Sequence, residues 1–572
     1  MKDNIKKIIE KAVEGNIPAF SIEIPSDKNH GDYSTNVALV LAKKIGKNPI
    51  ETANLIKDKI EESFGTAQDE NKLFSKIEIA GPGFINFFIA DKVFLDNLKN
   101  IDKDYGRNKK VEGSEGSRRI IIDYTDPNPF KEFHIGHLMS NAIGESLSRI
   151  FEFQGAKVKR VCYQGDVGMH VAKAIWGKMQ NENQSWGEAY AFGAQKYDED
   201  ENTKKQIQEL NKKIYQRSDK DINKFYDEGK KESLEHFDEI YKKLGTKFDD
   251  FIFESQTGEI GKKIVEKGLE KGIFEKGDNG AIIFKGEKYG LHTRVFINSE
   301  GLPTYEAKDL GLAEIKYKKY HYDQSVIVTG NEVNDYFKVM LCAMSQINPK
   351  LAERTKHIGH GMLRLPEGKM SSRTGKVITA ESLIEKVEEL ARQKIVSREA
   401  SEKPSSAKSY GGAKEKKEIT ENVAIGAIKY SILKQSIGSD IIYDFDKSIS
   451  FEGDSGPYLQ YSYTRAKSIL RKAKEEKIKP SFKRVPREIT QLEKSISYFP
   501  EVVLQAQKDY EPHYLVLYLT ELAGTFNSYY AKNKIVDKLD GYSSYKVALT
   551  EAFAIVMKNG LCLLGIKTLE KM

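Results

Sequence analysis

The stretch from Arg119 to Tyr163 constrains the fold of this chain more than any other segment. Residues 119–124 are rich in isoleucine and predict a strand, and residues 156–163 predict a second strand. Between them, a loop with two prolines leads into a helical pattern over residues 136–153. A strand, a helix and a strand of this size form a unit with two parallel strands. The sequence therefore predicts an α/β domain built on a parallel sheet.

The loop of this unit ends in the tetrapeptide His-Ile-Gly-His at residues 134–137. Ligands of open parallel sheets bind at the carboxyl ends of the strands, which is where this loop lies. The helix N-terminus offers free N–H groups to phosphates, and Gly136 allows a nucleotide to approach closely. His134 and His137 would donate hydrogen bonds to phosphate oxygens while charge builds in the transition state. We therefore interpret both histidines as catalytic.

The same tetrapeptide recurs at residues 357–360, where it runs into Gly-Met-Leu-Arg-Leu-Pro and precedes no clear helix. A tetrapeptide alone is a weak signal. We therefore assign the nucleotide site to the first copy because of its context. We expect the second copy to be a strand next to the nucleotide.

A glycine-flanked segment at residues 367–375 carries Lys369, Ser371 and Ser372. A lysine in such a loop can reach phosphates as a point charge. Alone, this segment would be interpreted as an ordinary solvated turn. Paired with the first tetrapeptide roughly 230 residues upstream, it predicts a second phosphate-binding element.

The pattern of the chain indicates several domains. We expect a small α+β domain at 1–105, a catalytic domain at 118–396 with a helical insertion at about 178–290, a mobile linker at 397–420 and an all-helical domain at 421–572. The linker is expected from its Ser, Lys, Glu and Gly content. The fold class is therefore multidomain α/β.

Composition narrows the class of protein. The net charge of +7 permits an anionic partner such as RNA but does not demonstrate one. The three cysteines lie far apart without zinc-like spacing, so we expect no zinc and a reducing cytoplasmic setting. No apolar run approaches the roughly 20 residues of a membrane span, so we expect no membrane association.

Residues 134–137 and 369–373 resemble the HIGH and KMSKS signatures of class I aminoacyl-tRNA synthetases, with Arg373 replacing the last serine. Four further segments resemble the arginyl-tRNA synthetases of that class. They are residues 123–128, residues 304–310, residues 453–461 with Arg465, and the N-terminal segment 29–36 with 81–86. The likeness covers nearly the whole chain. It implies a Rossmann-like catalytic domain, an additional N-terminal tRNA-binding domain and a helical anticodon-binding domain.

The resemblance also implies an arginine pocket. Asp309 matches the family's arginine-binding aspartate, and Tyr305 lies one helical turn before it. A guanidinium is a planar, permanently charged fork whose best partner is a bidentate carboxylate. Asp123 stands where the family usually has glutamate, and Asn128 would hold the α-ammonium or the carboxylate of the substrate. Val333 stands where the family often has glutamine and Tyr336 where it usually has histidine, so Glu332 or Asn331 would complete that side of the pocket.

By resemblance, the chain would activate L-arginine with ATP and transfer it to the 2′-hydroxyl of the terminal adenosine of tRNA(Arg). Mg²⁺ would accompany ATP, no protein-held metal is expected, and we expect a monomer. The implied catalytic residues are His134, His137 and Lys369. The implied ATP-binding residues are His134, Gly136, His137, Met362, Lys369, Ser371 and Ser372.

Three alternatives stay open from the residues. The chain could be a class I synthetase for another amino acid, although the N-terminal segment favours arginine. It could be a catalytically idle RNA-binding paralogue, against which the intact His134, His137, Lys369 and Asp309 speak. It could also be a small-molecule adenylating ligase, which the length and the helical C-terminal region disfavour.

Overall fold

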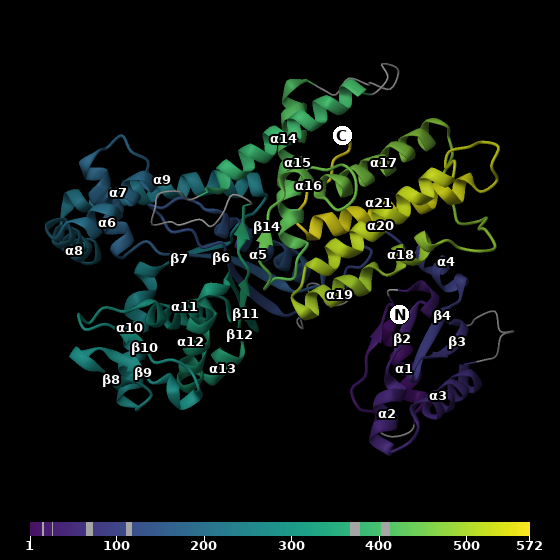
Figure 1. Ribbon diagram of the computed structural model, residues 1–572, viewed down its shortest axis with the longest axis horizontal. Coiled ribbons are helices and arrows are strands. Elements are labelled where there is room, and N and C mark those ends of the chain that lie inside the picture. The colour runs from purple at the N-terminus through teal and green to yellow at the C-terminus, as the bar shows by residue number, and fades with distance from the viewer. Residues whose placement is uncertain (14–15, 26, 65–72, 110–116, 366–377, 402–411) are drawn as a thin grey trace. The chain divides into compact units, whose positions relative to one another are not determined.

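The computed structural model describes residues 1–13, 16–25, 27–64, 73–109, 117–365, 378–401 and 412–572. The chain divides into two compact units, and most of their helices and strands are labelled in Figure 1. The first unit consists of Met1–Gly106, Ala466–Val503 and Glu521–Val556. The second consists of Arg107–Arg465, Leu504–Thr520 and Met557–Met572.

A five-stranded parallel sheet forms the centre of the second unit, in the order β12-β11-β5-β6-β7. Its strands are β5 (Arg119–Tyr124), β6 (Lys157–Gln164), β7 (Asp250–Phe253), β11 (Gln324–Gly330) and β12 (Thr355–His360). The predicted parallel unit is confirmed by β5 and β6. The chain adds strands first on one side of β5 and later on the other. The direction therefore reverses between β5 and β11, the point at which such sheets bind ligands.

Consecutive residues of β5 face opposite sides of the sheet, as pleating requires. Tyr124 donates a hydrogen bond of 2.6 Å to Glu145 of α5 (Ile135–Phe153). Asp123 instead pairs with Lys316 of α11 (Tyr305–Tyr320). Helix α5 thus covers one face and α11 the other, beside α10 (Glu254–Glu270), α12 (Asn334–Ile347) and α13 (Pro349–Glu353).

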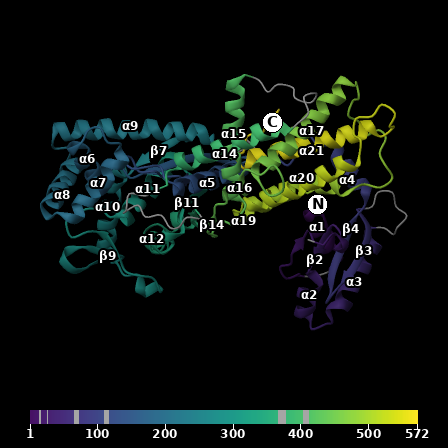
Figure 2. The same ribbon diagram turned by 45° about the horizontal axis from the view of Figure 1, so that its top comes forward.

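Four helices follow β6 and gather at one end of this unit (Figure 2). They are α6 (Met169–Gln180), α7 (Trp186–Glu199), α8 (Glu201–Gln216) and α9 (Lys220–Leu244). They have a core of their own, in which Ile207 and Ile214 belong to the same buried cluster as Val171 and Ile175. The sequence shows few core signals here because α8 and α9 each bury only a narrow stripe of apolar residues.

The prediction of a helical insertion at about 178–290 is wrong for part of that range. Strand β7 belongs to the central sheet, and a separate antiparallel sheet follows α10 in the order β10-β9-β8. Its strands are β8 (Glu275–Lys276), β9 (Ile282–Phe284) and β10 (Arg294–Ile297), with 3₁₀ turns η2 (Asp278–Gly280) and η3 (Gly286–Tyr289). Strands of two to four residues are too short for a period of two to be visible in the sequence.

The N-terminal part of the first unit is a four-stranded antiparallel sheet with helices. The strands are β1 (Ile22–Glu23), β2 (Tyr33–Thr35), β3 (Phe74–Ala80) and β4 (Phe84–Ile89), in the order β1-β2-β4-β3. Tyr33 and Phe87 are cross-strand partners and are both buried. The helices are α1 (Lys2–Ala12), α2 (Val37–Ile45), α3 (Pro49–Phe64) and α4 (Asp91–Lys99), with the 3₁₀ turn η1 (Lys28–His30). Strands β3 and β4 are joined by the Gly-Pro-Gly segment at residues 81–83.

The chain is almost wholly helical after residue 378. Its helices are α14 (Ala380–Ser401), α15 (Ala413–Leu433), α16 (Phe445–Ser448), α17 (Gly456–Glu475), α18 (Gln491–Ser497), α19 (Phe499–Asp509), α20 (His513–Lys532) and α21 (Ser543–Leu563). Within the described residues of this region, β14 (Ile441–Ile442) is the only strand, and it pairs with β13 (Leu363–Arg364). The prediction of a linker at 397–420 is wrong at both ends, because α14 and α15 extend into that range. Residues 402–411 lie outside the described part.

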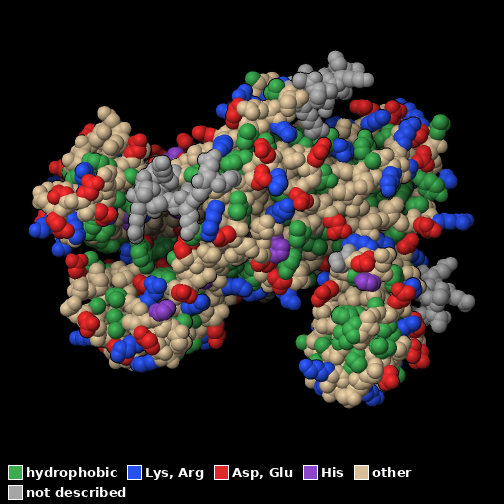
Figure 3. Space-filling view, viewed as in Figure 1, with side chains coloured by type: hydrophobic (Ala, Val, Ile, Leu, Met, Phe, Trp, Pro, Cys, Tyr) green, Lys and Arg blue, Asp and Glu red, His purple; other side chains and the backbone are tan. Residues whose placement is uncertain are grey.

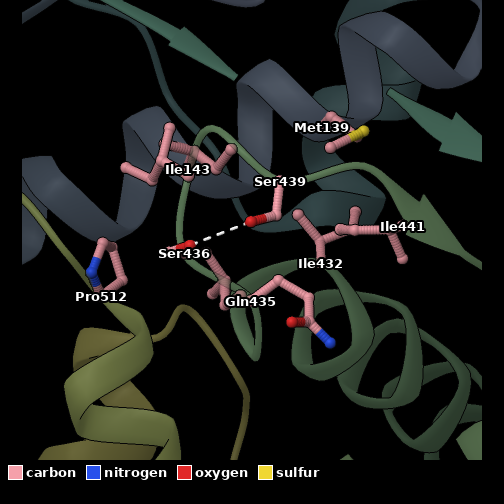
Figure 4. Close-up of a pocket in the computed structure, with 10 residues that line it drawn as sticks. Met139, Ile143, Ile432, Gln435, Ser436, Ser439, Ile441 and Pro512 are labelled. Atoms are coloured by element: carbon pink, nitrogen blue, oxygen red, sulfur yellow. Dashed lines mark hydrogen bonds between the residues drawn. The ribbon is translucent and has the colours of Figure 1, made fainter. Parts of the chain in front are cut away.

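Helix α5 is held from its outer side by the turn between α15 and β14. Figure 4 shows Met139 and Ile143 of α5 beside Ile432 and Ile441, with Ser436 and Ser439 hydrogen-bonded at 3.0 Å across the turn. The space left between these side chains is about 10 Å³, which is about the volume that one water needs. The helix that begins at the first histidine tetrapeptide is therefore closely packed.

Acidic and basic side chains are interspersed over the face of the molecule shown in Figure 3. This mixture agrees with the small net charge of +7. Among the described helices, none is long and apolar enough to cross a membrane.

The contact between α10 and α11 depends on glycine. A Cβ at Gly261 would collide with the backbone carbonyl oxygen of Ala307. A Cβ at Gly258, on the same helix, would meet only the Pro303 ring at 3.3 Å. We expect Gly261→Ala to lower the free energy of unfolding by about 1–3 kcal/mol through overpacking. Gly258→Ala is the control and should change it by less than about 1 kcal/mol, since alanine favours helix. Thermal melting compares the two, and equal melting temperatures would contradict the packing account.

Candidate active site

A cavity of about 660 Å³ opens at the carboxyl ends of β5, β6 and β11, where the strand order reverses. It collects residues from strands, loops and helices that lie far apart in the sequence. Polar groups in its lining include Asp123, Asp126, Asn128, His134, His137, Ser140, Tyr163, Glu254, Arg294, Tyr305, Glu306, Asp309, Thr329, Glu332, Tyr336 and His360.

The two histidines of the first tetrapeptide cap the N-terminus of α5. The N–H of Gly136 donates to Nδ1 of His134 at 3.1 Å, and the N–H of His134 donates to Nδ1 of His137 at 3.2 Å. Each Nδ1 is therefore an acceptor, so the proton of each neutral ring lies on Nε2. The rings stack with their centroids 3.6 Å apart. Two N–H donors therefore lie side by side at a helix N-terminus, an arrangement suited to phosphate oxygens.

Both histidines are held neutral. Burial, together with the positive charge of Lys131, lowers the pKa of His134 to about 4. Burial and the neighbouring His134 lower the pKa of His137 well below its usual value. The rings therefore act at neutral pH as hydrogen-bond donors rather than as cations.

The loop before the tetrapeptide has an unusual backbone that other elements hold in place. Thr125, Asp126 and Phe130 adopt positive φ angles of 81°, 50° and 68°, which non-glycine residues rarely adopt. Asp126 accepts from the N–H of Tyr163 at 2.8 Å, and the N–H of Phe130 donates to Ser233 at 3.0 Å. The end of β6 and helix α9 thus fix this loop, which supports the interpretation that its strain is functional.

Residues 378–381 form backbone hydrogen bonds with the loop that precedes α5 and with the first residue of α5. The N–H of Ala380 donates to the carbonyl of Phe133 at 2.8 Å, and the N–H of Ile135 donates to that of Ile378 at 3.4 Å. Glu381 accepts from His236 of α9 at 2.6 Å. The segment that follows residue 377 is therefore bonded directly beside the first histidine. Lys369, Ser371 and Ser372 themselves lie outside the described residues.

The cavity is rich in acids, three of which have basic partners. Lys316 pairs with Asp123 at 3.1 Å, Lys308 pairs with Glu254 at 2.5 Å, and Arg294 pairs with Glu306 at 3.2 Å. The other three acids of the lining are Asp126, Asp309 and Glu332. None of these three forms a salt bridge within the described part of the chain. The cavity therefore contains acidic side chains beyond those paired with bases, and a cationic ligand could pair with them.

Asp309 is the acid best placed to bind such a cation. Tyr336 donates a hydrogen bond to its carboxylate, and Tyr305 lies one helical turn earlier on α11. Burial raises the pKa of Asp309 to about 7, although the hydrogen bond from Tyr336 lowers it. Burial and the charge of Asp123 likewise raise the pKa of Asp126 well above its usual value. A bound cation would favour the ionised form of both carboxyls.

Comparison with known proteins identifies the family. The family model described as tRNA synthetases class I (R), catalytic domain, matches residues 100–445. The arginyl-tRNA synthetase N-terminal domain matches residues 1–89, and the DALR anticodon-binding domain matches residues 459–572. The chain belongs to the class I arginyl-tRNA synthetases. It is 32% identical to the arginine–tRNA ligase of Clostridium acetobutylicum, over 100% of this chain and 99% of that protein.

Solved arginyl-tRNA synthetases share the fold. The Thermus thermophilus structure aligns over all of both chains with a TM-score of 0.80 at 20% identity. The Plasmodium falciparum structure aligns over 100% of this chain and 99% of that chain, also with a TM-score of 0.80, at 22% identity. The parallel-sheet catalytic domain, the N-terminal domain and the helical C-terminal domain predicted from the sequence are thereby confirmed.

The structure brings most of the residues predicted from the family resemblance into one cavity. Eight of them line it, namely Asp123, Asn128, His134, Gly136, His137, Tyr305, Asp309 and Glu332. Met362 does not line it. Its N–H donates to Asp440 at 2.8 Å and its carbonyl accepts from the N–H of Ile441 at 2.8 Å. The expected contact between Met362 and ATP therefore has no support in the geometry.

Sequence reasoning missed several residues that line the cavity. Glu254 and Arg294 lay in or beside the expected insertion, and Tyr163 looked like an ordinary strand residue. The signal that could have found Glu254 is its position directly after β7, at the carboxyl edge of the same sheet. The strand expected for the second tetrapeptide is confirmed as part of β12, but its last residue, His360, was not singled out.

The buried Lys316–Asp123 pair provides a test of this charge arrangement, because each partner is only 1% exposed. Lys316→Met leaves Asp123 beside Asp126 without its cation, so we expect stability to fall by about 3 kcal/mol or more. Lys318→Met is the matched control, because Lys318 pairs with Glu314 on the exposed face of the same helix. It should change stability by less than about 0.5 kcal/mol. Thermal unfolding of both variants measures the difference, and similar losses would argue against a structural role for the buried pair.

Proposed function

We propose that this chain is an arginine–tRNA ligase that activates L-arginine with ATP and transfers it to the 2′-hydroxyl of the terminal adenosine of tRNA(Arg). The products are arginyl-tRNA, AMP and pyrophosphate. Membership of the arginyl-tRNA synthetase family along the full chain supports the reaction. The observation that supports arginine as the substrate concerns Asp309. This acid lines the cavity and lacks a basic partner among the described residues.

The side chain of arginine would fit the part of the cavity that Asp309 lines. A guanidinium offers paired N–H donors to a carboxylate and stacks on aromatic rings. Asp309 would accept its hydrogen bonds, and Tyr305 and Tyr163 supply aromatic rings in the same lining. The nearby Asp123 is already paired with Lys316. A neutral competitor would leave Asp309 buried without a cation, which is costly.

The α-carboxylate of the bound arginine would lie toward the loop before α5, and its α-ammonium group would lie toward Glu332. Oδ1 of Asn128 already accepts from the N–H of Gly165 at 2.8 Å. Its Nδ2 is therefore the atom that would donate to the arginine carboxylate. Glu332, exposed at the rim, would accept from the α-ammonium group.

The first step joins the two substrates. A carboxylate oxygen of arginine attacks the α-phosphorus of ATP, a new O–P bond forms, and the bond to the β-phosphate oxygen breaks to release pyrophosphate. Nε2–H of His134 and of His137 would donate to the phosphate oxygens, as their tautomers permit. Lys369 would neutralise the leaving pyrophosphate, with Ser371 and Ser372 supporting the phosphates. Mg²⁺ would enter with ATP as part of the substrate.

The second step transfers the amino acid. The terminal 2′-hydroxyl of tRNA attacks the carbonyl carbon of arginyl-adenylate, and AMP leaves with the acyl–phosphate oxygen.

We propose that the helical region from residue 421 reads the anticodon and that residues 1–105 bind another part of the tRNA, consistent with the matched domain models. We further propose domain limits of 118–396 for the catalytic part, a cytoplasmic location and a monomer.

Arginine-dependent exchange of labelled pyrophosphate into ATP, measured with and without tRNA(Arg), tests the function. We expect exchange with arginine in at least one of the two conditions and none with lysine or citrulline. Lysine carries a point charge without the planar fork, and citrulline has the shape of arginine without its charge. Exchange with a different amino acid alone would overturn the proposal.

Asp309 gives a specific prediction for arginine binding. Its pKa of about 7 in the free protein means that protons compete with the guanidinium below neutral pH. We expect the KM for arginine to rise as pH falls from 8 to 6, approaching tenfold per pH unit at the acid end. Asp309→Asn should raise the KM strongly and flatten this dependence. Asp335→Asn, on an exposed acid of α12 that pairs with Lys338, is the control and should behave like the parent. An unchanged KM in Asp309→Asn would exclude Asp309 from the pocket.

A further inference from the structure

The second copy of the histidine tetrapeptide forms part of β12, and its two histidines differ in surroundings. Residues three apart in a strand face opposite sides of the sheet. His357 accepts or donates a 2.8 Å hydrogen bond with the Thr329 hydroxyl and stacks on Phe337 at 3.8 Å. His360 instead lines the cavity and is only 4% exposed. The roles assigned to the first tetrapeptide leave this second copy without a function.

The hydrogen bond of His360 determines which of its nitrogens can bind a ligand. Its Nδ1 lies 2.7 Å from the carbonyl oxygen of Gly361. A carbonyl only accepts, so Nδ1 carries the proton and Nε2 of the neutral ring is an acceptor. Within the described residues, no hydrogen-bond partner is recorded for this Nε2. Burial lowers the pKa of His360 below its usual value, which keeps the ring neutral.

The two copies of the tetrapeptide therefore offer opposite chemistry to one cavity. His134 and His137 present two N–H donors, which suit phosphate oxygens. His360 presents a neutral acceptor, which suits a hydroxyl or amino donor. We propose that Nε2 of His360 accepts a hydrogen bond from a ribose hydroxyl of ATP and so helps the enzyme to select a ribonucleotide. The inference rests on the proposed function only in taking ATP as the nucleotide.

Position and charge favour the ribose over other donors. His360 lies on β12, on the far side of β11 from β5 and β6, whereas Asp123 and Asn128 of the arginine pocket follow or belong to β5. His360 and His137 line the same cavity. The ribose is attached to the α-phosphate that His137 would contact. Cationic groups of arginine would select carboxylates rather than a neutral imidazole.

Binding of nucleotides to the full chain, measured by calorimetry without arginine or tRNA, tests the assignment. The probes are ATP, 2′-deoxyATP, 3′-deoxyATP and purine riboside triphosphate, which lacks the 6-amino group. We expect one of the two deoxy nucleotides to bind about three- to tenfold more weakly than ATP, the loss typical of one hydrogen bond. Equal affinity for ATP and both deoxy nucleotides would overturn the proposal.

Variants then connect the discrimination to His360. His360→Phe should bind ATP about three- to tenfold more weakly and should no longer distinguish the deoxy nucleotide from ATP. His360→Gln can place an amide oxygen near the position of Nε2 and should restore part of the discrimination. It also keeps the test decisive if the phenylalanine variant does not fold. His357→Phe is the matched control, because it can keep the stack on Phe337 and does not line the cavity. It should discriminate like the parent.

Two other results would also overturn the proposal. If His360→Phe changes only the preference for the 6-amino group, the ring contacts adenine instead of ribose. If it raises only the KM for arginine in the exchange assay, the ring contacts the amino acid. The calorimetric result does not depend on which amino acid is activated. A chain that binds ATP with the expected discrimination but exchanges with another amino acid would therefore refute the arginine specificity alone.

Discussion

The site depends on how α5 begins. Two backbone N–H groups at its N-terminus donate to the Nδ1 atoms of His134 and His137, which orients both rings and leaves both Nε2–H groups free to donate. That orientation persists because the helix itself is held. Ser140 accepts from the N–H of Thr125 and donates to the carbonyl of Val328, which joins α5 to the ends of both β5 and β11. These two Nε2–H groups are therefore preorganised before any substrate arrives, which is the condition for electrostatic stabilisation of a transition state.

The second organising constraint is the charge balance of the cavity. Three of its acids are neutralised within the protein by Lys316, Lys308 and Arg294. Asp309 keeps a raised pKa because it is buried without a cation in the described part of the chain. An acid in this state gains most from a guanidinium and loses most from a neutral ligand. Selection of arginine would then follow from the cost of leaving a buried charge unpaired, without a separate editing site.

Much of this could be predicted from the sequence, for identifiable reasons. Strand β5 is an isoleucine-rich run, α5 has a clear helical period and β6 follows it, so this order of strand, helix and strand indicated a parallel sheet. Asp309 and Tyr305 could be placed together because residues four apart share a helix face. Other features were not predictable. The strands β8 to β10 are too short to show a period, and the partnership of Glu254 with Lys308 joins residues 54 positions apart.

The sequence by itself determined the long elements with a clear period, the family and the residue types that the chemistry needs, because local periodicity and motif spacing are properties of the sequence. Only the tertiary structure decided which of two identical tetrapeptides presents donors and which presents an acceptor. The first copy caps a helix through Nδ1, whereas His360 in the second donates from Nδ1 to a carbonyl. The tautomer of a histidine is set by the partner of its other nitrogen, and that partner is fixed by the fold rather than by the sequence letters.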